Sequence, residues 1–266
     1  MQLIDADDEN TWPKALLRGL EADREAIATF QRERARIDRA AEEDVMLRVC
    51  RPANPNQNAW DAALALGEHA TASGHLLGFH ATRLVEHEIE EIRQQGLQLL
   101  SVELLCRRVE ALTTAGAITD QQARRLLGYN QAAEDNRSGR TAFFFTRAQL
   151  KDHAGLDHLC RSWGGEALYN YHEDDPETGP LLRSIGIPSI VAAAVRVADI
   201  EPHFDIGQRL VNIWCVQRGI VTELPLDFGG VVRTHTPAAS ILRIIGISDP
   251  EFLALTAHDR WRNPLT

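Results

Sequence analysis

Apolar positions near the start of the chain recur at helical spacing. Within residues 11–46 they are separated by mixed charges and comprise Leu16, Leu20, Ile27, Phe30 and Ile37. This spacing places them on one face, so the segment is predicted to be one long amphipathic helix or a helical hairpin. Because such an apolar stripe needs a cover, we expect residues 1–50 to pack on the rest of the chain or on a second subunit.

A polar segment follows this helical arm. Residues 51–58 contain two prolines and three asparagines, a composition typical of a linker. We therefore expect two regions, a helical arm over residues 1–50 and a larger domain over residues 59–266.

The larger region mixes helical and strand patterns. Short apolar runs predict strands at 76–81, 141–146, 187–197, 231–234 and 241–247. Helical spacing begins at Val85 and ends at Gly96, and it recurs over 102–114. A capping-box pattern predicts a further helix from Thr119 to about residue 134.

Periodicity does not decide between helix and strand for 206–217. Helices come early and strands are scattered later, without regular alternation of the two. The predicted fold class is therefore α+β.

Composition narrows the class of protein. The chain has 266 residues and a formal net charge of −10, which argues against wrapping a long nucleic acid through phosphate contacts alone. It lacks a long uncharged apolar run and the pattern of a secretory signal, so we expect a cytoplasmic protein with no membrane partner. The four cysteines form no C-x-x-C pair; we expect reduced core thiols and no metal site.

The most informative polar pattern is Gly78-Phe79-His80-Ala81-Thr82-Arg83, which follows the first apolar run. Alternate residues of a strand point to one face, so His80 and Thr82 are predicted to lie side by side. An imidazole beside a hydroxyl can hold a ribose diol or an amide. The alternative is a histidine whose ring nitrogens are satisfied by backbone at the end of a strand.

His-x-Thr at a strand end, followed by a helix and Gly96-Leu97, resembles the first motif of the ADP-ribosyltransferase superfamily. That superfamily includes poly(ADP-ribose) polymerases, tRNA 2′-phosphotransferases and bacterial toxins that modify nucleic acids. The resemblance covers about residues 74–247. It implies a split mixed or antiparallel sheet and NAD as cofactor. It also implies ADP-ribosyl transfer to an acceptor macromolecule, or NAD cleavage, by a toxin- or defence-type protein.

Further residues extend the resemblance. Phe143-Phe144-Phe145-Thr146 is similar to the second strand of the family, and Ser162-Trp163-Gly164-Gly165-Glu166 begins a segment similar to the following helix. The resemblance implies that Tyr169, or else Trp163, stacks on nicotinamide, with an aromatic ring of the strand beneath. The implied NAD contacts are His80, Ala81, Thr82, Arg83, Phe145, Thr146, Trp163 and Tyr169.

The third motif of the family is a glutamate at the start of a late strand, where this chain has Phe228-Gly229-Gly230. That glutamate would stabilise the oxocarbenium charge. We expect Glu166 to take this role, because it follows two glycines and a helix would place it on one face with Tyr169. Glu223 is the second choice, and Asp227 lies nearby. The implied catalytic residues are thus His80, Tyr169, Glu166 and Glu223.

Two other hypotheses stay open. The displaced glutamate favours a module on the same fold that binds a nucleotide or ADP-ribose without turnover. The charged helical arm favours an interaction protein, or a homo-oligomer formed through the arm. His235, beside the late strand, is a further candidate for the cleft.

Overall fold

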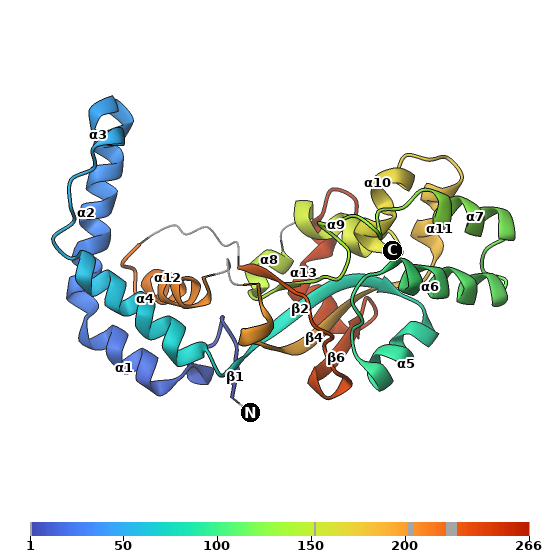
Figure 1. Ribbon diagram of the computed structural model, residues 1–266, viewed down its shortest axis with the longest axis horizontal. Coiled ribbons are helices and arrows are strands. Elements are labelled where there is room, and N and C mark those ends of the chain that lie inside the picture. Colours follow the sequence, from blue (N-terminus) through green and yellow to red (C-terminus); the bar gives the residue numbers. More distant parts are fainter. Residues whose placement is uncertain (1, 152, 202–204, 222–227, 266) are drawn as a thin grey trace. The chain divides into compact units, whose positions relative to one another are not determined.

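The computed structural model describes residues 2–151, 153–201, 205–221 and 228–265. It divides the chain into two compact units (Figure 1). Unit 1 comprises Met1–Leu76, Arg196–Ala198 and Pro202–Leu226, and unit 2 comprises Leu77–Val195, Asp199–Glu201 and Asp227–Thr266. The described residues form thirteen α-helices and a six-stranded sheet, which confirms the mixed α and β composition. Unit 1 is larger than the predicted arm.

Five helices build unit 1: α1 (Lys14–Ala22), α2 (Arg24–Glu43), α3 (Val45–Val49), α4 (Gln57–Thr71) and α12 (Ile206–Gln217). The predicted helical segment is therefore interrupted at Asp23, between α1 and α2. Its five stripe residues are all buried. Part of the cover comes from α4, where Trp60 stacks on Phe30 with ring centroids 5.0 Å apart. The predicted linker thus connects two parts of one unit.

Residues 206–217, which periodicity left undecided, form the helix α12. It crosses α4 with backbone against backbone: a Cβ on Gly67 would lie 2.9 Å from the Cα of Gly207. The Glu68 carboxylate accepts a hydrogen bond from the Gly207 N–H at 2.6 Å and so satisfies a donor in the first turn of α12. A short strand, β1 (Leu3–Ile4), pairs in parallel with His75 and Leu76.

The five predicted strands are all present: β2 (His75–Leu84), β3 (Thr141–Phe144), β4 (Ile187–Arg196), β5 (Gly229–Val232) and β6 (Ile241–Gly246). Their order is β5-β3-β2-β4-β6. Strand β3 is antiparallel to β2 and β5, and β6 is antiparallel to β4. In β3, Thr141 and Phe143 are buried, whereas Ala142 is exposed.

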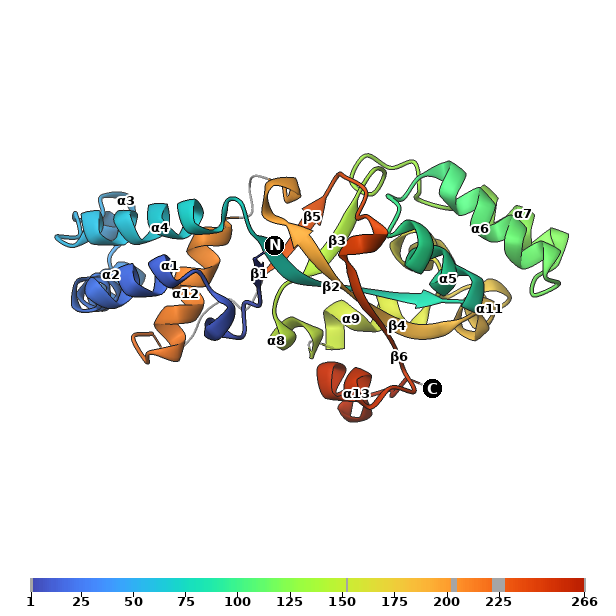
Figure 2. The ribbon, with the colours of Figure 1, turned by 90° about the horizontal axis from the view of Figure 1, so that it is seen from below.

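The two faces of β2 in unit 2 have different covers. Phe79 and Ala81 face a core formed with α8 (Arg147–Leu150), α9 (His153–Arg161) and α13 (Pro250–Thr256). On the opposite side lie α5 (Glu86–Gln95) and α6 (Val102–Thr114) (Figure 2). A second core joins α6 to α7 (Asp120–Gly128) and α11 (Thr178–Ser184).

Gly78 allows two aromatic rings to approach β2 closely. A Cβ on Gly78 would lie 3.0 Å from the rings of both Phe143 and Phe145, so glycine lets these rings pack against β2. Cys160 and Cys215 are buried as predicted, and burial raises the pKa of each thiol to about 12. Cys50 is exposed, so the prediction of core thiols is wrong there.

Candidate functional site

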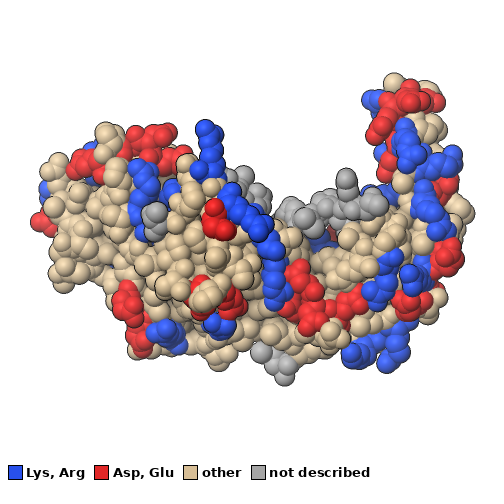
Figure 3. Space-filling model, turned by 180° about the vertical axis from the view of Figure 1, so that it is seen from behind, with Lys and Arg blue, Asp and Glu red and all other residues tan. Residues whose placement is uncertain are grey.

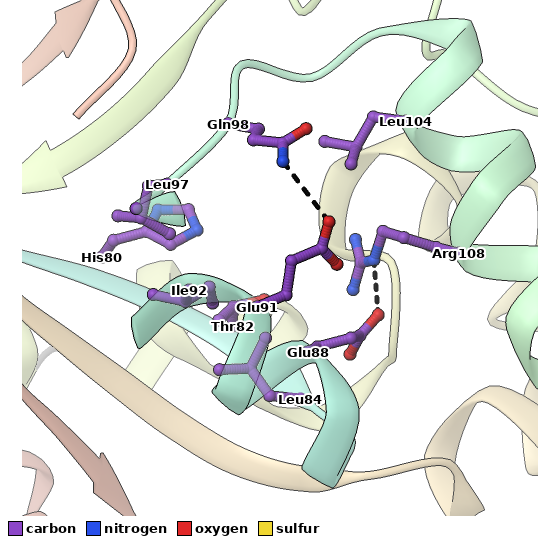
Figure 4. A pocket seen from close by; sticks show the side chains of 11 residues that line it. His80, Thr82, Leu84, Glu88, Glu91, Ile92, Leu97, Gln98, Leu104 and Arg108 are labelled. Atoms are coloured by element: carbon purple, nitrogen blue, oxygen red, sulfur yellow. Dashed lines mark hydrogen bonds and ion pairs between the residues drawn. The ribbon is translucent and has the colours of Figure 1, made fainter. Parts of the chain in front are cut away.

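A cavity of about 100 Å³ lies in unit 2 between β2 and helices α5 and α6 (Figure 4). Strand β2, helix α5, the segment 96–98 and helix α6 supply its lining. The lining residues are His80, Thr82, Leu84, Glu88, Glu91, Ile92, Gly96, Leu97, Gln98, Leu104 and Arg108. We call this cavity the β2 pocket.

The segment 96–98, which lines part of the β2 pocket, is held by backbone contacts. Gly96 has φ of +86°, and a Cβ there would lie 2.0 Å from the Thr236 carbonyl oxygen. Leu97 and Thr236 exchange two backbone hydrogen bonds of 2.9 and 3.1 Å. His235 Nε2 donates to the Gln95 carbonyl at 2.6 Å. His235 is thus a support for the segment and does not line the pocket.

His80 enters the pocket from β2 with one ring nitrogen already used. Its Nδ1 donates to the Ala142 carbonyl at 2.9 Å, because a carbonyl can only accept. The other nitrogen, Nε2, makes no hydrogen bond with the described residues and is an acceptor when the ring is neutral. Desolvation, together with the nearby Arg108 charge, lowers the pKa of His80 despite the opposing effect of the Ala142 bond. The ring is therefore neutral at pH 7.

Thr82 lies two residues further along β2, on the same face, as the alternation of the strand predicts. Its side chain is mostly buried. Its hydroxyl makes no hydrogen bond within the part of the chain that the structure describes. His80 and Thr82 therefore present an acceptor and a hydroxyl side by side to the pocket.

The lining of the β2 pocket includes a buried ion pair, Glu88 with Arg108. The Glu88 side chain is 5% exposed, and it accepts from Arg108 Nε at 2.6 Å and from the Val85 N–H at 2.9 Å. Trp163, fully buried, donates its indole N–H to the same carboxylate at 3.1 and 3.2 Å. The Arg108 guanidinium also lies over the Trp163 ring, 4.6 Å from its centroid. Trp163 thus holds the pair in place rather than lining the pocket.

Besides His80 and Thr82, two further side chains of the pocket, Arg108 and Glu91, can bind a ligand. Arg108 Nη2 is buried and has no hydrogen-bond partner among the described residues. Glu91, with its side chain 34% exposed, is only loosely held: Gln98 Nε2 lies 3.4 Å and Arg107 Nη2 3.9 Å from its Oε1. An unpartnered buried donor costs about 1–3 kcal/mol, so a ligand acceptor at Nη2 would recover part of that cost.

Ala81 and Arg83, expected to contact the cofactor, point to the opposite face of β2. The Ala81 side chain packs in the core. Arg83 is buried, and its Nε, Nη1 and Nη2 donate to the carbonyls of Ile185, Cys160 and Gly186 at 2.8, 3.3 and 2.8 Å. Neither side chain faces the β2 pocket, because one residue along a strand reverses the face.

Tyr169 and Glu166 also lie away from the β2 pocket. Tyr169 stacks on His158 of α9, with ring centroids 4.9 Å apart, and α9 covers the face of β2 opposite to His80. Glu166 is half exposed and lies 3.9 Å from Arg137. The structure therefore does not bring Tyr169 together with His80 and Thr82, contrary to the shared NAD site that the resemblance implies. Glu223 and Asp227 lie outside the described residues.

Only one of the three phenylalanines at 143–145 packs against His80. Phe144 pairs with Phe79 and packs with it, away from the pocket. Phe143 consequently lies on the His80 side, with ring centroids 6.0 Å apart. Phe145 is buried against Phe143 and Phe228, and Thr146 donates to Gln149 at 3.3 Å. Neither Phe145 nor Thr146 lines the pocket.

The described part of the chain contains no group of three or more His, Cys, Asp or Glu side chains placed to hold a metal ion. None of its helices has the length and apolar character needed to cross a bilayer.

Glu88 and Arg108 line the β2 pocket but were not predicted as site residues, although the sequence pattern around each of them indicates burial. Glu88 lies within the apolar stripe of α5, with Val85, Ile89 and Ile92. Arg108 similarly lies within the stripe of α6, beside Leu105, Val109 and Leu112. A charged residue inside an apolar stripe is buried and needs a partner of opposite charge. The pattern therefore predicts an ion pair between these two helices.

Comparison of the chain with protein-family models, with curated proteins and with solved structures found no match.

Proposed function

We propose that the β2 pocket binds the ribosyl part of NAD or a related nucleotide, on an ADP-ribosyltransferase-like core, and that the protein cleaves NAD or transfers its ADP-ribose. The observation that carries this proposal is the pairing of His80 and Thr82 on one face of β2, in a cavity that also contains a carboxylate and an arginine. The resemblance of His-x-Thr to the first family motif supports it further.

The ligand chemistry follows from the open groups. A ribose diol offers two hydroxyls, which can each donate and accept. His80 Nε2 accepts from one, and the Thr82 hydroxyl bonds to the other. Arg108 Nη2 donates to a carbonyl or phosphate oxygen of the same ligand. The size of the cavity, about 100 Å³, is below the 300–1,000 Å³ usual for a whole ligand, so it holds one moiety while the remainder lies outside.

Glu91 takes the catalytic role that was expected for Glu166. Cleavage breaks the bond between ribose C1″ and the nicotinamide nitrogen, and nicotinamide leaves with the electron pair. A carboxylate near the resulting oxocarbenium stabilises its charge. Glu88 is unsuited, since its oxygens already accept from Arg108, Val85 and Trp163. The acceptor then attacks C1″ and loses a proton.

The second candidate function is binding of a nucleotide or ADP-ribose without turnover. One observation favours it: apart from His80, no aromatic ring is among the residues lining the β2 pocket, so nothing there would stack on nicotinamide.

Release of nicotinamide from NAD separates the two functions. The test compares the unmodified protein with Glu91→Gln and with the matched control Glu90→Gln, one position away on α5 and 54% exposed. We expect Glu91→Gln to lower turnover by a factor of about 10²–10³ and Glu90→Gln to leave it unchanged. Equal turnover in both variants would refute the role of Glu91.

Thermal shift completes the test. A ligand at 100 times its dissociation constant stabilises the folded state by about 2.7 kcal/mol. Stabilisation by ADP-ribose that is lost in His80→Ala, without any NAD consumption by the unmodified protein, would favour the binding module. No stabilisation by NAD or ADP-ribose at millimolar concentration would refute both functions. The exposed His69→Ala serves as control.

A further inference from the structure

The helix α3 of unit 1 exposes an apolar surface. Its residues Val45, Met46 and Val49 are 65%, 67% and 76% exposed, the highest values among the large apolar side chains of the described residues. Figure 1 shows α3 at the far end of α2. We call α3 the tip helix. Exposed apolar residues clustered in this way are typical of an interaction site.

Unit 1 also contains a groove beside the tip helix. It has a volume of about 390 Å³ and lies between α2, the segment 51–54 and α4. Its apolar lining includes Phe30, Ile37, Pro52 and Trp60. We call it the arm groove. Unit 1 therefore has both an exposed apolar helix, the tip helix, and an apolar groove, the arm groove.

The charges around these two features are opposite. The tip helix follows three consecutive acids, Glu42, Glu43 and Asp44, and itself contains one arginine, Arg48, so the tip keeps a net negative charge. The rim of the arm groove holds Arg34 and Arg51, which share one carboxylate, Asp38, at 3.8 and 2.6 Å. The rim thus keeps a net positive charge. Figure 3 shows acidic side chains at the end of the helical arm and basic side chains along the helix below it.

We propose that two copies of this chain form a dimer by reciprocal insertion, with the tip helix of each copy in the arm groove of the other. Charge complementarity favours a second copy, because the acids of one tip meet the arginines of the other groove. Two-fold symmetry makes both insertions at once. The exchange also enlarges the contact, since five helical residues alone fall short of the roughly 800 Å² per partner of a stable interface.

The test measures molar mass by light scattering across a range of concentrations, with reductant present because Cys50 is exposed. The tip variant carries Glu42→Lys and Glu43→Lys, and the groove variant carries Arg34→Glu and Arg51→Glu. Arg24→Glu with Arg39→Glu is the control of equal charge change; both positions lie on α2, the helix of Arg34, and outside the groove. Circular dichroism checks folding. If a charge variant misfolds, Met46→Ser, at an exposed position, tests the same contact.

The unmodified protein and the control are expected to dimerise. Each charge variant alone should dimerise at least about tenfold more weakly, because like charges then face one another. An equimolar mixture should recover the dimer, since a basic tip meets an acidic groove and an acidic tip meets a basic groove. A monomer at every concentration would overturn the proposal. So would a dimer that persists in the groove variant, which a contact between two tips alone would give.

Discussion

Arg83 and Arg108 are both removed from water in unit 2, yet their surroundings differ. Arg83 lies on the core side of β2, and all three of its guanidinium nitrogens donate to backbone carbonyls. Arg108 forms one short bond to Glu88, and its buried Nη2 has no partner among the described residues. The comparison indicates that the Arg83 guanidinium has a structural role, whereas the Arg108 guanidinium has an N–H donor available for a ligand.

The largest effect should come from removing the satisfied arginine. Arg83→Met leaves three carbonyls without their donor, and we expect the free energy of unfolding to fall by about 3 kcal/mol or more. Denaturant melts measure this. Arg93→Met, at an exposed position of α5, should change stability by less than about 0.5 kcal/mol. Equal losses in the two variants would show that the Arg83 bonds contribute little.

The second variant, Arg108→Met, should have a smaller effect on stability and a larger one on binding. Glu88 loses its counterion but keeps the bonds from Val85 and Trp163, so we expect a loss of about 2 kcal/mol. Adding Glu88→Gln should recover part of it, with a coupling of about 1 kcal/mol in a double-mutant cycle. Binding of ADP-ribose should be lost in both. Full binding by Arg108→Met would remove the distinction between the two arginines.

Trp163 contacts Arg108 and Glu88 but does not line the β2 pocket, so a Trp163 variant tests whether Arg108 needs this support to bind a ligand. Trp163→Phe keeps a ring beneath the guanidinium but removes the indole donor to Glu88. We expect a loss of about 1 kcal/mol in unfolding free energy and a weaker affinity for ADP-ribose, measured by calorimetry. A variant that kept full affinity would show that Arg108 needs no support from Trp163.

The smallest effect concerns pH. The pKa of His80 is lowered in the folded protein from its ordinary value of 6.5, so between these two values the unfolded chain binds more protons. Stability is therefore full above about pH 6.5 and decreases as the pH falls toward the folded pKa. His80→Asn should reduce this decrease, measured as unfolding free energy at about pH 7.5 and 5.5. His69→Asn should not; if both variants kept the decrease unchanged, His80 would not be its source.

The strands were predictable because apolar runs of Val, Ile and Phe need burial in a sheet. The pairing of His80 with Thr82 followed from strand alternation alone. The register between β2 and β3 could not be predicted from the sequence. Only the observed pairing of Phe79 with Phe144 shows that Phe143, and not Phe144, lies on the same side of the sheet as His80. Such pairing depends on contacts between segments far apart in the sequence.

Tyr169 and Glu166, which the resemblance adds to the site, do not line the β2 pocket. Their order along the chain does not determine this, because Tyr169 stacks on His158 of α9 instead. The polar pair that does line the pocket, Glu88 and Arg108, was visible only as charges inside apolar stripes. The sequence did not predict that α12 belongs to unit 1. This membership depends on the contact of Gly67 with Gly207, which joins α4 and α12 although they are far apart in the sequence.

The position of ADP-ribose in a crystal of the protein tests most directly whether the β2 pocket binds the ribose of the nucleotide. We predict that its ribose hydroxyls lie within hydrogen-bond distance of His80 Nε2 and the Thr82 hydroxyl, with an oxygen of the ligand at Arg108 Nη2. Density for the ligand beside Tyr169 and Glu166 instead, with an empty β2 pocket, would contradict the account.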